Sequence, residues 1–102
     1  MTETSVRSRR QVMIIDPLGL HLRPAAKLVV LARSFRSDIR VVARGTMADA
    51  KSLLDLVTLA AGCGTALDIA AQGPDAEEAV AALTELLGAG LDGSMNRGVA
   101  AA

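Results

Sequence analysis

The sequence of 102 residues contains very few aromatic, thiol or imidazole side chains. It has one phenylalanine, one cysteine and one histidine, and it has no tryptophan or tyrosine. The near absence of aromatic rings removes the stacking surfaces on which unpaired nucleic-acid bases bind. The 11 basic and 11 acidic residues balance, so no net charge attracts a polyanion. We therefore expect no nucleic-acid partner.

The scarcity of cysteine and histidine also limits the metal chemistry of the chain. Cys63 has no second cysteine with which to form an intrachain disulfide, which favours a reducing compartment. One cysteine and one histidine do not make up the usual side-chain zinc site, so we expect no metal and no other cofactor. The sequence also lacks the ~20 consecutive apolar residues of a membrane-spanning helix and a secretory signal at its start. It predicts a cytoplasmic protein without membrane insertion.

The hydrophobic pattern predicts a single small domain in which strands and helices alternate. Strands are predicted for residues 11–15, 39–43, 46–50 and 66–71, and helices are predicted to begin near residues 23, 52 and 76. The resulting order, β-α-β-β-α-β-α, is typical of a two-layer α+β fold. We expect a four-stranded antiparallel sheet with three helices on one face.

The domain is expected to cover residues 10–92. Residues 1–9 are polar, carry charges of both signs and show no periodicity, so they are interpreted as a flexible N-terminal extension. Residues 93–102 are mostly small and unpatterned, and they are interpreted as a flexible C-terminal tail. Asp75 is placed to act as the N-cap of the last helix.

The chemistry of the chain centres on its single histidine. His21 lies in the loop directly before the first predicted helix, where the backbone N–H groups of Leu22 and Arg23 have no acceptor within the helix. Such N–H groups and the helix dipole form an anion site, to which the Arg23 guanidinium adds a countercharge. This arrangement is suited to holding a phosphoryl group on an imidazole nitrogen. A solvated loop histidine and arginine would have the same spacing.

Ser52 begins a second motif. Asp55 follows it at the third position, a pattern similar to a capping box, which predicts that the serine hydroxyl caps a helix. A phosphate on Ser52 would suit a helix N-terminus, but the Asp55 carboxylate would oppose it. Leu53, Leu54 and Val57 follow on this short helix and cannot all point into the core; they form either an exposed apolar patch or part of the core.

Three separated segments carry a family resemblance. They are GLHLRPAAKLV at residues 19–29, DAKSLL at residues 49–54, whose serine lies 31 residues after His21, and GPDAEEAV at residues 73–80. They resemble, in turn, the active-site segment, the regulatory-serine segment and the start of the last helix of HPr, the histidine phosphocarrier of the bacterial phosphotransferase system. The resemblance spans residues 11–87 and implies the family's open-faced two-layer β-sandwich.

The resemblance also implies a function. His21 would accept a phosphoryl group on Nδ1 (the pros nitrogen) from enzyme I and pass it to enzyme IIA-type domains, with Arg23 stabilising the phosphate. The protein would then be a monomeric carrier and not an enzyme in its own right. HPr kinase/phosphorylase would act on Ser52, and the apolar residues of the second helix would dock partners; these are Leu53, Leu54 and Val57.

Two positions depart from the family pattern. Leu22 is larger than the residue that usually follows the histidine, and Asp55 places an acid in the docking region. Both changes concern partners more than phosphate chemistry. Two alternatives therefore stay open: a nitrogen-branch or purely regulatory HPr paralogue, and an interaction module that is not phosphorylated.

Overall fold

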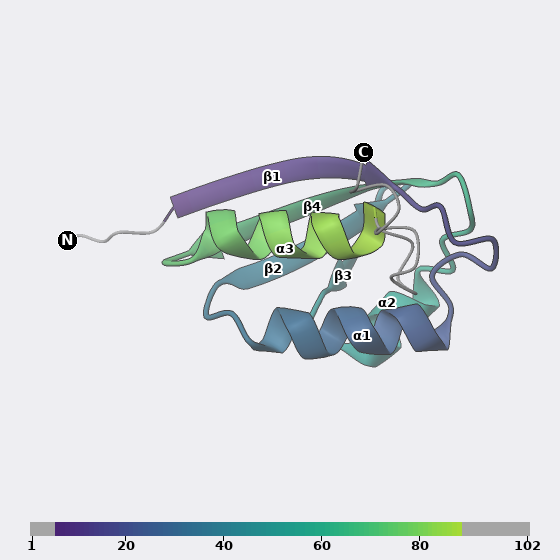
Figure 1. Ribbon diagram of the computed structural model, residues 1–102, viewed down its shortest axis with the longest axis horizontal. Helices are drawn as coiled ribbons and strands as arrows, with labels where there is room; N and C mark the ends of the chain where they lie inside the picture. Colours follow the sequence, from purple (N-terminus) through teal and green to yellow (C-terminus); the bar gives the residue numbers. More distant parts are fainter. Residues whose placement is uncertain (1–5, 89–102) are drawn as a thin grey trace, which may run out of the picture.

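The computed structural model of the chain describes residues 6–88. They form a four-stranded antiparallel sheet of order β1-β4-β2-β3, and three helices cover one of its faces, as the sequence predicted (Figure 1). The strands are β1 (Val6–Met13), β2 (Asp38–Ala43), β3 (Thr46–Asp49) and β4 (Ala66–Gly73). The helices are α1 (Leu22–Arg33), α2 (Leu53–Thr58) and α3 (Ala76–Gly88).

The core lies between the sheet and the helices. Alternate residues of the central strands point into it, among them Val41 of β2 and Ile69 of β4, both fully buried. Helix α1 contributes Leu28 and helix α3 contributes Leu83, which are also fully buried. Because each layer turns an apolar face toward the other, the two layers enclose one core between them.

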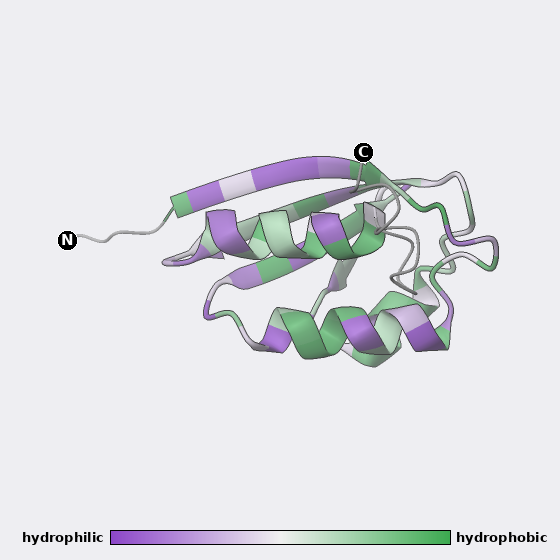
Figure 2. Ribbon diagram, viewed as in Figure 1, coloured by the Kyte–Doolittle hydropathy of each residue, from purple (hydrophilic) through white to green (hydrophobic). Residues whose placement is uncertain are grey.

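The first strand begins earlier than the sequence predicted. It runs from Val6 to Met13, and it pairs with β4 from Val6 opposite Gly73 to Met13 opposite Ala66. The interpretation of residues 6–9 as a flexible extension was therefore wrong. The error arose because β1 is polar in composition. It is an edge strand, and it carries charged side chains at positions where a central strand would have alternating apolar ones (Figure 2). Residues 1–5 and the predicted tail at 93–102 lie outside the described residues.

Asp75 joins the start of α3 to the turn before β2. Its carboxylate accepts hydrogen bonds from the backbone N–H groups of Arg36 and Ser37, both at 2.9 Å, and from the Ser37 hydroxyl at 2.6 Å. The hydrogen bond from Arg36, followed by that from the Ser37 hydroxyl, lowers the pKa of Asp75. Asp75 was predicted as the N-cap of the last helix; its carbonyl oxygen accepts the N–H of Ala79 at 2.9 Å at the start of α3, whereas its carboxylate accepts these three hydrogen bonds and links two elements.

No helix within residues 6–88 combines the length and the apolar character needed to cross a membrane.

Candidate functional site

His21 is the N-cap residue of α1. Its backbone is extended (φ −85°, ψ −174°), and its carbonyl oxygen accepts the N–H of Ala25 at 3.0 Å. Pro24 has no N–H group, so Leu22 and Arg23 supply the open donors of the first helical turn. The structure thus places His21 directly before the first helix, as predicted from the sequence, and anion binding by the two N–H groups stays a prediction.

The loop before His21 is held against the segment that follows α2. The N–H of Leu20 donates to the carbonyl of Ala61 at 2.8 Å, and the Leu20 side chain is buried. Gly19 has a φ of +73°, and a Cβ atom there would lie 2.6 Å from the Ala61 oxygen and 2.7 Å from Gly62 Cα. Only glycine fits this contact without a shift of the backbone. The position of His21 therefore depends on close packing at Gly19.

An acidic residue that sequence reasoning missed faces the imidazole. Oδ2 of Asp16 lies 3.7 Å from Nε2 of His21, and the two side chains are 19% and 35% exposed. Oδ1 of Asp16 accepts the N–H of Leu18 at 2.9 Å, and its carbonyl accepts the N–H of Gly19 at 2.8 Å. In the sequence, Asp16 marked only the end of a strand. The run Asp-Pro-Leu-Gly was the available signal for this turn. In an Asx turn, the aspartate side chain accepts the backbone N–H of the residue two positions later.

Arg23 lies on the exposed side of the first turn of α1. Within residues 6–88 its guanidinium has no hydrogen-bond or ion-pair partner. An unpaired guanidinium at a helix N-terminus is available to bind an incoming phosphate in a bidentate manner.

Ser52 caps α2, as predicted. Its hydroxyl accepts the N–H of Asp55 at 3.2 Å, and Oδ2 of Asp55 accepts the N–H of Asp49 at 3.1 Å. The Arg33 side chain, at the end of α1, donates to the carbonyl of Lys51 at 3.1 Å. Ser52 therefore lies near the C-terminal end of α1, whereas His21 lies at its N-terminal end. With a rise of about 1.5 Å per residue, a helix of this length separates its ends by roughly 17 Å.

The three leucine and valine positions of α2 are exposed to different extents. Leu54 is 75% exposed, whereas Leu53 and Val57 are 36% and 37% exposed. Leu56 and Leu59 fill the core in their place. Two further apolar side chains of the His21 loop and first turn are exposed, Leu18 at 74% and Leu22 at 60%. We call these five residues the apolar surface; they are Leu18, Leu22, Leu53, Leu54 and Val57.

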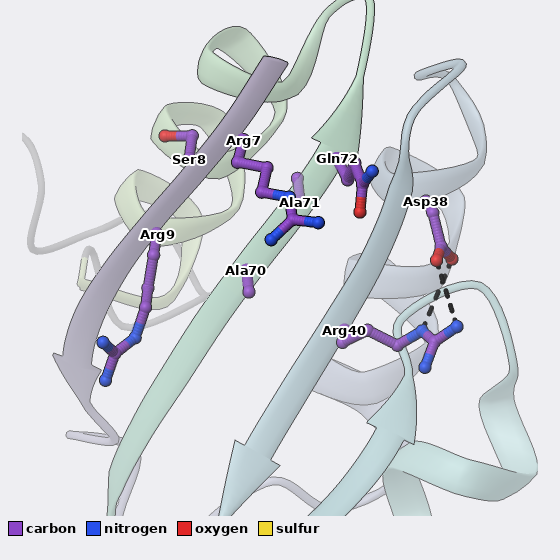
Figure 3. Close-up of a pocket in the computed structure, with 8 residues that line it drawn as sticks. All are labelled: Arg7, Ser8, Arg9, Asp38, Arg40, Ala70, Ala71 and Gln72. Atoms are coloured by element: carbon purple, nitrogen blue, oxygen red, sulfur yellow. Dashed lines mark hydrogen bonds and ion pairs between the residues drawn. The ribbon is translucent and has the colours of Figure 1, made fainter. Parts of the chain in front are cut away.

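The open face of the sheet has a hollow of about 520 Å³ (Figure 3), and His21 is not among the residues that line it. Arginines from two strands line it, but most of their charge is already paired. Arg40 donates to both oxygens of Asp38, at 3.0 and 3.4 Å, and Arg9 lies 3.3 Å from the Asp68 carboxylate. Because these carboxylates neutralise two of its guanidinium groups, the hollow is a weaker anion site than the start of α1.

Residues 8–89 match the family described as the PTS HPr component phosphorylation site. The chain belongs to the HPr family. It is 47% identical over 78 residues to the phosphocarrier protein HPr of Vibrio cholerae, covering 76% of this chain and 92% of that one. It is 40% identical over 83 residues to the phosphocarrier protein NPr of Shewanella violacea, covering 81% and 91% of the two chains. The crystal structure of HPr from Bacillus anthracis aligns with a TM-score of 0.76 at 36% identity, covering 79% and 96%.

Membership in the HPr family confirms the resemblance on which the sequence analysis relied. The α+β fold, with its antiparallel sheet open on one face, is that of the HPr structures. The matched region also begins at Ser8, inside the stretch that was interpreted as an extension, in agreement with the early start of β1.

Proposed function

We propose that this HPr family member is a phosphocarrier that accepts a phosphoryl group from enzyme I on His21 and passes it to enzyme IIA-type domains. The observation that carries the proposal is the location of His21 at the N-cap of α1, before the open N–H groups of Leu22 and Arg23. The names of the relatives, phosphocarrier proteins HPr and NPr, support it. The chain itself supplies the nucleophile and the phosphate-binding groups, and its partners supply the catalytic groups.

We assign the phosphoryl group to Nδ1 because Nε2 faces a carboxylate. Oδ2 of Asp16 is 3.7 Å from Nε2. Two unit charges of the same sign about 4 Å apart repel by about 1 kcal/mol in water and about 4 kcal/mol at an effective dielectric constant of 20. A phosphoryl group on Nε2 would carry this penalty. Nδ1 is the nitrogen that avoids it, and Arg23 and the two N–H groups favour an anion at the start of the helix.

The apolar surface is the proposed docking site for both partners. Leu22 directly follows the phosphate-accepting residue, and Leu54 is exposed on the neighbouring helix α2, toward the Ser52 end of α1. Because the carrier must bind and release two proteins in turn, a small surface of this kind suits transient complexes. The carrier is proposed to act in the cytoplasm as a monomer.

Regulation at Ser52 by HPr kinase/phosphorylase is a second part of the proposal. The hydroxyl now caps α2, so a phosphate there would replace a hydroxyl acceptor with a charged one beside the N–H of Asp55. The Asp55 carboxylate opposes this change. Since Ser52 and His21 lie at opposite ends of α1, the modification would act through the apolar surface and not by touching His21.

Incubation with enzyme I and phosphoenolpyruvate tests the carrier function. The expected product is a phosphoprotein whose phosphate is labile in acid and stable in alkali, and His21→Ala should abolish it. Ser52→Ala is the matched control and should label normally. A chain that none of several enzymes I phosphorylates would favour the interaction module instead.

A paired assay distinguishes the sugar branch from the nitrogen branch. Enzymes I of both branches should phosphorylate the chain at different rates, and the faster one identifies the branch. The NPr relative at 40% identity makes the nitrogen-branch enzyme the necessary second arm.

A further inference from the structure

The Asp16 carboxylate is fixed by its own loop. Its Oδ1 atom accepts the N–H of Leu18 at 2.9 Å, and its carbonyl oxygen accepts the N–H of Gly19 at 2.8 Å. Pro17, the next residue, restricts the backbone further. The second carboxylate oxygen, Oδ2, is left facing Nε2 of His21 at 3.7 Å. The contacts that hold the carboxylate in the turn thus do not involve the imidazole.

A fixed carboxylate acts differently on the two tautomers of neutral imidazole. When Nε2 carries the proton, the positive end of the N–H dipole is on the nitrogen nearest the carboxylate, and electrostatic attraction stabilises this tautomer even at 3.7 Å, a separation longer than a hydrogen bond. When Nδ1 carries the proton, the lone pair of Nε2 points toward the same charge and is destabilised. The groups that face the two ring nitrogens therefore decide which nitrogen carries the proton. In serine proteases, a carboxylate holds the catalytic histidine in one tautomer in this way.

We propose that Asp16 is a positioning residue that keeps the proton of neutral His21 on Nε2 and so leaves the Nδ1 lone pair free to accept the phosphoryl group. This inference rests on the proposed carrier function. It assigns to Asp16 a role in selecting the reactive nitrogen, in addition to its role in the turn before α1.

The proton on Nε2 need not move in either transfer step. In the forward step, the Nδ1 lone pair attacks phosphorus, an N–P bond forms at His21, and the bond from phosphorus to the donor breaks with its electron pair returning to the donor. In the second step, the acceptor attacks phosphorus and the electron pair of the N–P bond returns to Nδ1. Because Nε2 keeps its proton, His21 leaves as neutral imidazole and not as an anion. Between the steps, the carboxylate faces a ring that carries positive charge.

The substitution Asp16→Asn separates the turn from the charge. An asparagine Oδ1 can still accept the N–H of Leu18, so the turn is retained. Its amide N–H₂ group replaces the oxygen that faces Nε2, and an amide donor there favours a lone pair on Nε2 with the proton on Nδ1. We expect the ratio of Nδ1–H to Nε2–H tautomer to rise about two- to fivefold, the range of a partly exposed charged pair.

The ratio is measured by ¹⁵N NMR of the imidazole in unphosphorylated protein, at a pH raised until the spectra no longer change. Asp68→Asn is the matched control, because it removes the same charge on the open face of the sheet beside Arg9. An unchanged ratio in Asp16→Asn, or an equal change in Asp68→Asn, would overturn the proposal. Thermal unfolding of both variants checks that they fold.

The rate of transfer from phosphorylated enzyme I gives the second measurement. We expect Asp16→Asn to slow it by at most about threefold, because a fivefold rise in the tautomer ratio lowers the fraction of an initially predominant Nε2–H tautomer by no more than that factor. An unchanged rate alongside a shifted tautomer would overturn the role in transfer. Failure of enzyme I to label even the unsubstituted protein would instead refute the carrier function, since the tautomer measurement does not depend on phosphorylation.

Discussion

Replacing Gly19 by alanine tests whether the loop before His21 is held by close packing. Gly19 has a φ of +73°, and a Cβ atom would meet two backbone atoms, the Ala61 oxygen at 2.6 Å and Gly62 Cα at 2.7 Å. A positive φ costs an alanine about 1–2 kcal/mol, and overpacking against atoms that cannot rotate away costs about 1–3 kcal/mol more. We therefore expect Gly19→Ala to lower the free energy of unfolding by about 2–5 kcal/mol.

Gly45→Ala is the matched control for backbone strain. Gly45 has a φ of +79°, but no atom lies within 4 Å of the position of its added Cβ. Only the positive φ then contributes, and the expected loss is about 1–2 kcal/mol. Urea unfolding followed by circular dichroism measures both variants, since the chain has no tryptophan or tyrosine for fluorescence. Equal losses in the two variants would refute the packing argument.

Gly19→Ala should also slow phosphorylation of His21 under conditions where the variant is folded. The backbone must move away from Ala61 to admit the methyl group, and this movement displaces the residues that lead into α1. Gly45→Ala, in the turn between β2 and β3, should be phosphorylated at the normal rate. A normal rate for Gly19→Ala would show that His21 keeps its position without this contact.

Three further predictions concern phosphate binding, docking and stability. Arg23→Ala should slow transfer by roughly 10- to 100-fold, the value of a charge-assisted hydrogen bond, with thermal stability unchanged; an equal rate in rapid-mixing assays would contradict its role. Leu54→Ala should raise the KM of enzyme I for the carrier with little change in kcat, and steady-state kinetics with an unchanged KM would remove it from the docking site. Because the pKa of Asp75 is lowered in the folded state, its contribution to stability is present above the unfolded value of about 3.8 and is lost as the pH falls through the lower folded value. Asp75→Asn should therefore flatten the dependence of stability on pH in that acidic range, and acid unfolding curves with the same slope in both proteins would contradict this.

The sequence predicted the fold well because the central strands and two long helices follow simple periodic patterns. In β4, alternation from Leu67 to Ala71 marks the buried face, and in α3 the apolar residues recur at helical spacing. The edge strand β1 was predicted only from residue 11, since its first half carries arginines that face solvent or the open side of the sheet. A hydrophobic pattern detects buried side chains, whereas the first half of this strand is placed by its pairing with β4 and carries polar side chains.

The candidate site was predictable only in its local part. His21, Leu22 and Arg23 are neighbours in sequence, so a helix that begins after the histidine brings their groups together. The contact with Asp16 depends on the turn geometry of the loop before α1, which a residue pattern indicates only weakly. The separation of Ser52 from His21 depends on how α2 packs along α1, which is a tertiary property.

The packing of α2 along α1 limits how many partners can bind the carrier at the same time. Ser52 sits beside one end of α1 and His21 sits at the other, with the exposed Leu54 on the helix that starts at Ser52. A standard protein interface covers about 800 Å² on each partner, which is enough to span both ends of such a helix. Any two proteins that recognise this side would therefore exclude each other, so that the carrier serves one at a time. The rate of phosphoryl transfer would then be limited by how quickly each partner dissociates. An abundant protein that binds the same leucines would lower this rate by competition, without any chemical modification of the carrier.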